Sequence, residues 1–125
     1  LLLPAGTAAA GTAARPALPD RAHTVGAVLR LTVSHPDHYL SGARTVALTC
    51  EPAAGTHPNA PAACADLDRT GGRIAVQPAD AVCTLEYHRV VGKAVGWWRG
   101  RLISFQQTYP NLCALHAHTG SVFRF

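Results

Sequence analysis

Apolar and polar residues alternate most clearly between residues 27 and 50. The segments 27–33 and 44–50 are rich in β-branched residues, and Val46 and Leu48 fall on one face of the second segment. This pattern is typical of half-buried strands. A polar loop over residues 34–42 separates the two segments, so we expect them to pair as an antiparallel hairpin.

A helix is predicted after the Pro- and Gly-rich segment 51–62. Asn59 can act as its N-cap, and Pro61 suits its first turn. Residues 62–69 contain good helix formers, and the Gly-Gly pair at 71–72 is a typical helix end.

The rest of the chain predicts short strands and one more helix. Strands are expected over residues 73–77, 89–91, 95–98, 101–105 and 121–125, and a short helix around Cys113. Adjacent strand residues point to opposite faces, so one of Trp97 and Trp98 is expected in the core.

Composition and charge restrict the class of protein. The 125 residues are 48% hydrophobic and 14% charged, which indicates one globular domain. The net charge of +4 comes from scattered basic residues without a basic stripe, so nucleic-acid binding is not expected. No stretch approaches the roughly 18 apolar residues of a membrane span, so no membrane partner is expected.

The N-terminal segment has a different character from the rest. Its first ten residues resemble the end of a secretory signal, an apolar remnant followed by small residues. We therefore interpret residues 1–20 as a signal-peptide remnant or disordered arm and residues 21–125 as the domain. A secreted, extracellular protein is expected.

Cysteines support this localisation. Four of them, at positions 50, 64, 83 and 113, suggest two disulfides formed in an oxidising compartment. Three connectivities are possible, and a Cys50–Cys64 bridge would close a 15-residue loop, worth about 3 kcal/mol in the chain-entropy model.

Candidate chemistry is sparse. The chain has no CxxC pair, and its seven histidines show no convincing ligand set, so we expect neither a metal nor a cofactor. It has no Gly-x-Ser-x-Gly motif, and none of its four serines has a nucleophile setting, so no enzymatic activity is expected.

One short segment stands out as a candidate binding site. Residues 82–87 read Val-Cys-Thr-Leu-Glu-Tyr, with Leu85 at the centre and Cys83 two positions upstream. A crosslinked loop offering one apolar side chain is the format of a protease-directed binding loop. A disulfide-anchored strand entry is the alternative.

A longer pattern then resembles a known family. The spacing Cys50-x-Pro52-x-x-Gly55-x-His57-Pro58-x4-Ala63-Cys64-Ala65-x-Leu67 is similar to the signature of the Streptomyces subtilisin inhibitor family. The resemblance continues to the C-terminus, through Gly71-Gly72, Trp98-x-Gly100, Ser104-Phe105, Asn111-x-Cys113, Ala117-His118 and Ser121-Val122-Phe123-x-Phe125.

The resemblance implies a fold and a disulfide pairing. The fold is α+β, a single five-stranded antiparallel sheet with two helices packed on one face. The implied bridges are Cys50–Cys64 and Cys83–Cys113. The family also implies a homodimer formed through a sheet face, where Arg30 would lie among apolar residues.

The resemblance also implies an inhibitory site. Its scissile bond would be Leu85–Glu86, with Val82, Cys83, Thr84 and Tyr87 as the other protease contacts. Thr84 stands where proline is frequent in the family. Asn111 would brace this loop through its side-chain amide, or would act instead as a helix cap.

The expected function is a secreted, non-enzymatic inhibitor of subtilisin-like serine proteases. Leu85 suits an apolar specificity pocket and offers nothing to the carboxylate of a trypsin-type pocket. One alternative is an inhibitor of a secreted metalloprotease that acts through another surface, such as the His35-Pro36 loop. Another is a secreted binding module whose loop is disabled by Glu86.

Overall fold

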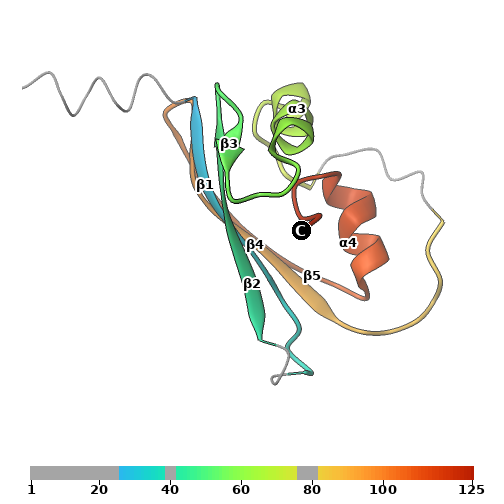
Figure 1. The fold of residues 1–125 in the computed structure, drawn as a ribbon. Coiled ribbons are helices and arrows are strands. Elements are labelled where there is room, and N and C mark those ends of the chain that lie inside the picture. The colour runs from blue at the N-terminus through green and yellow to red at the C-terminus, as the bar shows by residue number, and fades with distance from the viewer. Residues whose placement is uncertain (1–25, 39–41, 76–81) are drawn as a thin grey trace, which may run out of the picture.

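The computed structural model describes residues 26–38, 42–75 and 82–125. In this part of the chain, five strands form one antiparallel sheet in the order β3-β2-β1-β4-β5. The strands are β1 (Ala27–Ser34), β2 (Ala43–Cys50), β3 (Ala54–Gly55), β4 (Val90–Trp98) and β5 (Arg101–Tyr109). Helices α3 (Ala60–Thr70) and α4 (Leu112–Thr119) cover one face of the sheet (Figure 1). The α+β fold expected from the resemblance is confirmed, whereas the interpretation of residues 1–20 and the domain boundary at residue 21 lie outside the described residues.

The hairpin predicted from alternation is present. β1 pairs with β2 over its whole length, with Leu29 opposite Leu48 and Leu31 opposite Val46. These side chains face the helices, and the alternate positions of the strands form the opposite, solvent-facing surface. The two tryptophans divide as predicted, because Trp98 is only 4% exposed and Trp97 is 54% exposed.

Helix α3 begins and ends close to the predicted positions. A proline lies in its first turn, and it ends at Gly71, whose φ of 66° is readily adopted by glycine. Asn59 occupies the N-cap position, but its side chain makes no capping hydrogen bond. Its main-chain N–H instead donates to Nδ1 of His57 at 2.9 Å. Ala60, Ala63 and Leu67 are the buried residues of the helix, on the side that packs on the sheet.

Two predicted strands are wrong, and one strand was missed. Residues 73–75 and 121–125 belong to no strand, and residues 76–77 lie outside the described residues. Val122 and Phe123 are fully buried because the C-terminal segment packs between the helices and the sheet, so their apolar character reflects core packing without a strand partner. The fifth strand is the two-residue β3, which pairs with β2.

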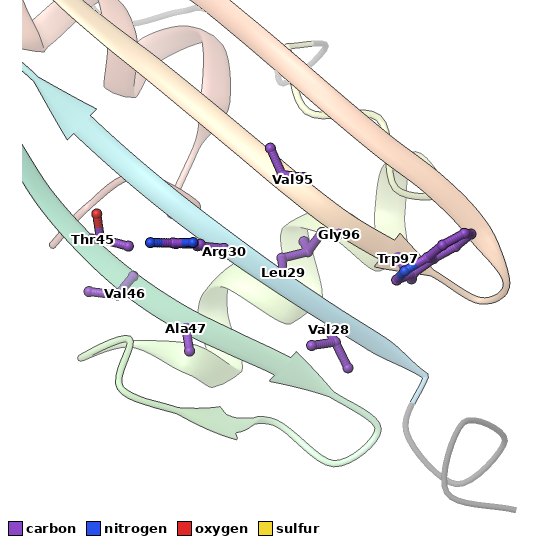
Figure 2. Close-up of a pocket in the computed structure, with 9 residues that line it drawn as sticks. All are labelled: Val28, Leu29, Arg30, Thr45, Val46, Ala47, Val95, Gly96 and Trp97. Atoms are coloured by element: carbon purple, nitrogen blue, oxygen red, sulfur yellow. The ribbon is translucent and has the colours of Figure 1, made fainter. Parts of the chain in front are cut away.

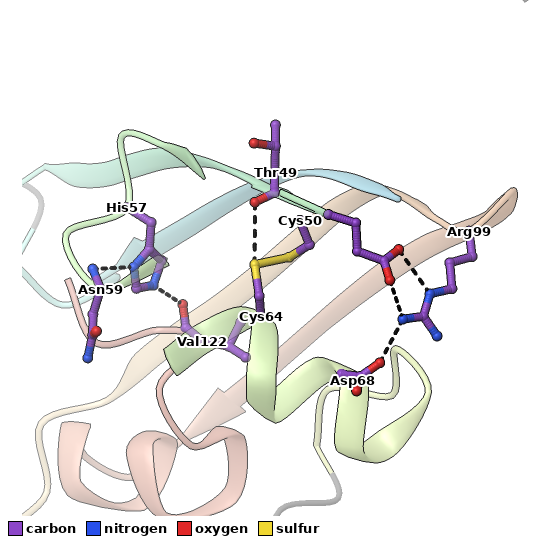
Figure 3. Close-up of a disulfide and its surroundings, with 9 residues drawn as sticks. Thr49, Cys50, His57, Asn59, Cys64, Asp68, Arg99 and Val122 are labelled. Atoms are coloured by element: carbon purple, nitrogen blue, oxygen red, sulfur yellow. Dashed lines mark hydrogen bonds and ion pairs between the residues drawn. A yellow bond between two sulfur atoms is a disulfide. The ribbon is translucent and has the colours of Figure 1, made fainter. Parts of the chain in front are cut away.

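Two disulfides tie irregular segments to this framework. Cys50 at the end of β2 is bonded to Cys64 in α3, beside the hydrogen bond from His57 to the carbonyl of Val122 (Figure 3). Cys83 is bonded to Cys113 in α4. Both pairs are those that the family resemblance implies. In the described part of the chain, no helix has the length and apolar character needed to cross a membrane.

Candidate functional site

The segment between residues 82 and 89 lies outside all helices and strands. It runs along the outer side of α4 and returns to the sheet at the start of β4 (Figure 1). Leu85 is 99% exposed and Val82 is 97% exposed, and Tyr87 is also exposed. Large apolar side chains gathered on one exposed segment are typical of an interaction site.

A disulfide fixes the N-terminal part of this segment. Cys83 lies two residues before Leu85, and its bond to Cys113 attaches it to the first turn of α4. The bridge spans 30 positions of the sequence, and the Leu85–Glu86 peptide bond lies within the loop that it closes. If that bond were cut, the two new chain ends would still be joined through the disulfide.

Asn111, the residue before α4, also joins the exposed segment to this helix. Its side chain is 8% exposed, and its Oδ1 accepts a hydrogen bond from the main-chain N–H of Ala114 at 2.8 Å, as an N-cap does. Its Nδ2 donates to the carbonyl oxygens of Thr84 at 3.3 Å and Glu86 at 2.8 Å. The loop brace and the helix cap, which the sequence left as alternatives, are therefore both present in one side chain.

The residues after Leu85 are held by further contacts. The main-chain N–H of His88 donates to the carbonyl of Pro110 at 2.8 Å. The imidazole Nε2 of His88 lies 2.9 Å from a carboxylate oxygen of Glu86. Both ends of the exposed segment are thus attached to the folded domain.

The turn that follows β1 also contacts the exposed segment. The guanidinium of Arg89 donates two hydrogen bonds to the carboxylate of Asp37, at 2.7 and 3.3 Å. The hydrogen bond from Arg89 is the main reason why the pKa of Asp37 lies below its usual value. The ring of His38 lies 5.9 Å from that of His88. Asp37 lies in the turn that follows β1, so this turn holds the C-terminal end of the exposed segment through Arg89.

These supporting residues were missed by the sequence analysis. Asp37 and Arg89 are 52 positions apart, and neither belongs to a motif with a fixed spacing. The one local signal was the acidic and imidazole side chains of Glu86 and His88, two positions apart. Whether two side chains at this spacing touch depends on the backbone conformation between them, which the sequence alone does not give.

The solvent-facing surface of the sheet is the other exposed apolar region. A shallow hollow there is lined by residues that include Val28, Arg30, Val95 and Trp97 (Figure 2). Arg30 is exposed and lies opposite Val95 in the β1–β4 register. The family resemblance implies a dimer contact on such a face, with Arg30 within it.

The histidines have structural contacts. His57 is buried, and its ring lies between the main-chain N–H of Asn59 and the carbonyl of Val122. His118 stacks on Tyr109 at the surface, with ring centroids 5.8 Å apart. Within residues 26–38, 42–75 and 82–125, no three His, Cys, Asp or Glu side chains gather in a way that could hold a metal ion.

The arrangement is suited to presenting a peptide bond. The Leu85 side chain is free to enter a pocket of another protein, while the carbonyl groups on either side of it are held by Asn111. A segment held in this way loses little conformational freedom on binding, which favours affinity.

Known proteins share this sequence and fold. A profile of the subtilisin inhibitor-like family matches residues 25–111. Subtilisin inhibitor-like protein 2 of Streptomyces rochei is 51% identical over 85 residues, which cover 66% of this chain and 75% of that protein. The subtilase-type protease inhibitor of Streptomyces coelicolor is 39% identical over 125 residues, covering 96% of this chain and 87% of the relative.

A solved structure shows the same architecture. It is Streptomyces caespitosus sermetstatin, crystallised in complex with Bacillus licheniformis subtilisin. It superimposes with a TM-score of 0.59 at 27% sequence identity, covering 79% of this chain and 98% of that one. With the family profile matched over most of the folded domain, this chain belongs to the subtilisin inhibitor-like family, a family of protease inhibitors rather than enzymes.

Proposed function

We propose that this protein inhibits subtilisin-like serine proteases by presenting the Leu85–Glu86 bond to their active site. The observation that carries the proposal is the full exposure of Leu85 between two main-chain carbonyls held by Asn111. Val82, Cys83, Thr84 and Tyr87 complete the contact segment. The relatives named as subtilase-type inhibitors, and the relative crystallised with subtilisin, support the class of target.

Binding would use the main chain and one pocket. The segment around Leu85 would pair as an extended strand with exposed strands of the protease. Its main-chain groups would form hydrogen bonds that do not depend on the side chains of the segment. Leu85 would fill the primary specificity pocket with a branched apolar side chain. A trypsin-type pocket, whose carboxylate requires a basic side chain, would gain nothing from it.

Inhibition would follow from slow and reversible cleavage. The protease serine Oγ attacks the carbonyl carbon of Leu85, and its proton passes through the protease histidine to the nitrogen of Glu86 as the C–N bond breaks. Because Asn111 holds the carbonyl of Glu86 and the Cys83–Cys113 bond spans the cut, the new amine stays beside the acyl-enzyme. The amine can then attack the ester carbonyl, which re-forms the peptide bond and releases the serine.

Titration of subtilisin with the oxidised protein tests this function. We expect stoichiometric inhibition, with an inhibition constant of nanomolar or tighter, which corresponds to about −12 kcal/mol. Mass analysis after brief acidification should show only the intact chain and a form cut between Leu85 and Glu86. Rapid degradation at several bonds would contradict the proposal.

The Leu85→Gly variant separates this proposal from the two alternatives. It should lose inhibition of subtilisin while keeping its fold, because the leucine side chain is fully exposed. An inhibitor of a secreted metalloprotease acting through the His35-Pro36 loop would keep its activity in this variant. A binding module without inhibitory activity would fail to inhibit in both forms.

The sheet face supports a proposed homodimer. Val28, Val95, Trp97 and Leu102 are all exposed on the side of the sheet away from the helices. A two-fold contact between these surfaces would remove four large apolar side chains of each copy from water, which favours association.

Secretion is also a proposal for this chain. Two disulfides in a small domain suit an oxidising extracellular environment. The small and apolar residues of segment 1–20 agree with a signal-peptide remnant ahead of a domain that begins near residue 21. Mass analysis of the protein recovered from culture medium would identify its N-terminus.

A further inference from the structure

Glu86, the residue that follows the proposed scissile bond, has its carboxylate next to the side chain of His88. An oxygen of the Glu86 carboxylate lies 2.9 Å from Nε2 of His88, and both side chains are exposed to solvent. In the free protein, an exposed pair of this kind contributes little to stability. In a complex with a protease, however, both groups would lie at the border of the contact region, where less water is present and an unpaired carboxylate costs more free energy than in the free protein.

His88 is itself well positioned to hold this carboxylate. Its main-chain N–H is bonded to the carbonyl of Pro110 at 2.8 Å, which fixes the start of the side chain. Its ring lies 5.9 Å from that of His38. The neighbouring residue, Arg89, is held by two hydrogen bonds to Asp37. The backbone around His88 is therefore anchored on both sides.

The charged groups around His88 leave Glu86 as its carboxylate partner. Asp37, the acidic residue of the facing turn, is occupied by the guanidinium of Arg89. His38 brings a second imidazole close to the ring of His88, and Arg89 follows it in the sequence. Because Arg89 is already paired with Asp37, Glu86 is the acidic side chain in contact with the His88 ring.

We propose that His88 is a positioning residue that pairs with Glu86 and prevents its carboxylate from entering the protease subsite as an unpaired charge. The proposal rests on the proposed function, since it concerns the residue that follows the bond offered to the protease. It gives His88 a part in specificity, because it makes an acidic residue after the scissile bond acceptable to proteases whose subsite there is apolar.

A double-mutant cycle in subtilisin inhibition tests the pairing. It compares the wild type with the variants Glu86→Gln, His88→Gln and the two combined. In the wild-type background, we expect His88→Gln to raise the inhibition constant for subtilisin by about threefold to fivefold at low salt, as for an ion pair that water still reaches. The same change should have almost no effect in the Glu86→Gln background, where no carboxylate needs a partner.

Three further measurements separate positioning from a general structural role. His88→Arg should restore most of the inhibition, because it restores a positive donor. The coupling between positions 86 and 88 should shrink at about 1 M salt, where the screening length is about 3 Å. His35→Gln, which changes a histidine of the facing turn outside this contact, serves as the control and should leave the inhibition constant unchanged.

The outcomes distinguish this inference from the proposed function. Equal effects of His88→Gln in both backgrounds, with all four proteins still inhibiting subtilisin, would overturn the pairing and leave the inhibitor function intact. Failure of the wild type itself to inhibit subtilisin would overturn the proposed function, and the role of His88 with it.

Discussion

The side-chain amide of Asn111 donates a 2.8 Å hydrogen bond to the main-chain carbonyl of Glu86, 25 positions earlier in the chain. The oxygen of the same amide caps α4 through the N–H of Ala114. Because Asn111 is largely buried, water competes little for these bonds. The geometry of the exposed segment therefore depends on the start of a helix.

Substitution of Asn111 can separate its two roles. Asn111→Ser keeps a good helix-capping oxygen but is too short to reach Thr84 and Glu86, whereas Asn111→Ala loses both functions. We expect Asn111→Ser to be more stable than Asn111→Ala by about 1 kcal/mol, the usual worth of an N-cap, in urea unfolding. Both variants should be cut by subtilisin faster than the wild type. A serine variant that resists cleavage as well as the wild type would contradict the bracing role.

Truncation of Leu85 should weaken inhibition without affecting the fold. Leu85→Ala removes a side chain that would be buried only in the complex, at a cost of about 1.5–3 kcal/mol, or roughly 10- to 100-fold in the inhibition constant. Leu102→Ala is the matched control, because Leu102 is exposed on the sheet, away from the site. Leu85→Ala should unfold at the wild-type temperature, because the Leu85 side chain is 99% exposed. Equal inhibition constants for the two variants would argue against Leu85 as the specificity residue.

Removal of the Cys83–Cys113 bridge should convert the inhibitor into a substrate. In the chain-entropy model, a bridge spanning 30 positions is worth about 3–4 kcal/mol. A double change to serine should therefore lower the free energy of unfolding by about this amount, and the chain cut at Leu85–Glu86 would no longer be joined across the cut. Inhibition should become temporary, with activity returning as the variant is consumed. Lasting inhibition by this variant would show that other contacts suffice.

Local sequence patterns accounted for the regular part of the fold. β1 alternates between buried and more exposed positions along its whole length, and β2 does so over its second half. Their pairing could therefore be predicted from this period and from the loop between them. Helix α3 carries its own boundary signals in Pro61 and Gly71. The two-residue strand β3 has no alternation to detect, and it exists because β2 offers it a partner.

Tertiary contacts determine the conformation of the C-terminal segment and of the candidate site. Phe123 and Phe125 favour a strand by propensity, yet Phe123 is buried against Phe105, and Phe125 meets the edge of His57. In the candidate site, the sequence pointed to residues 82–87 through one cysteine and a family resemblance. It gave no sign of the supports from Asp37 and Pro110, because these are contacts between distant turns.

His116 should make stability depend on pH. Burial, and the nearby charge of Arg124 to a lesser extent, lower its pKa, while the hydrogen bond to the carbonyl of Phe123 opposes them. The unfolded chain therefore binds a proton more readily than the folded one, so stability falls as the pH drops below the ordinary histidine value of about 6.5. We expect the free energy of unfolding to decline over this range and the decline to be smaller in His116→Gln. An unchanged slope in that variant would exclude His116 as its source.

Salt should strengthen the proposed dimer. The outward positions of the paired strands include Arg30 and Lys93 but no acidic side chain among the described residues, so a two-fold contact would bring four positive charges together. Raising the ionic strength from about 0.01 M to 0.1 M shortens the screening length from about 30 Å to about 10 Å and should reduce this repulsion. Sedimentation velocity should therefore show tighter association with added salt.

Arg30→Thr should produce tight association already at low salt, since it removes two of the four charges from the contact. Arg44→Thr gives the same net charge, but Arg44 lies opposite Val33, whose side of the sheet faces the helices, so this variant should behave as the wild type. If both variants strengthened association equally, overall charge would be responsible. A dimer that weakened with salt would place the contact on another surface, where opposite charges meet.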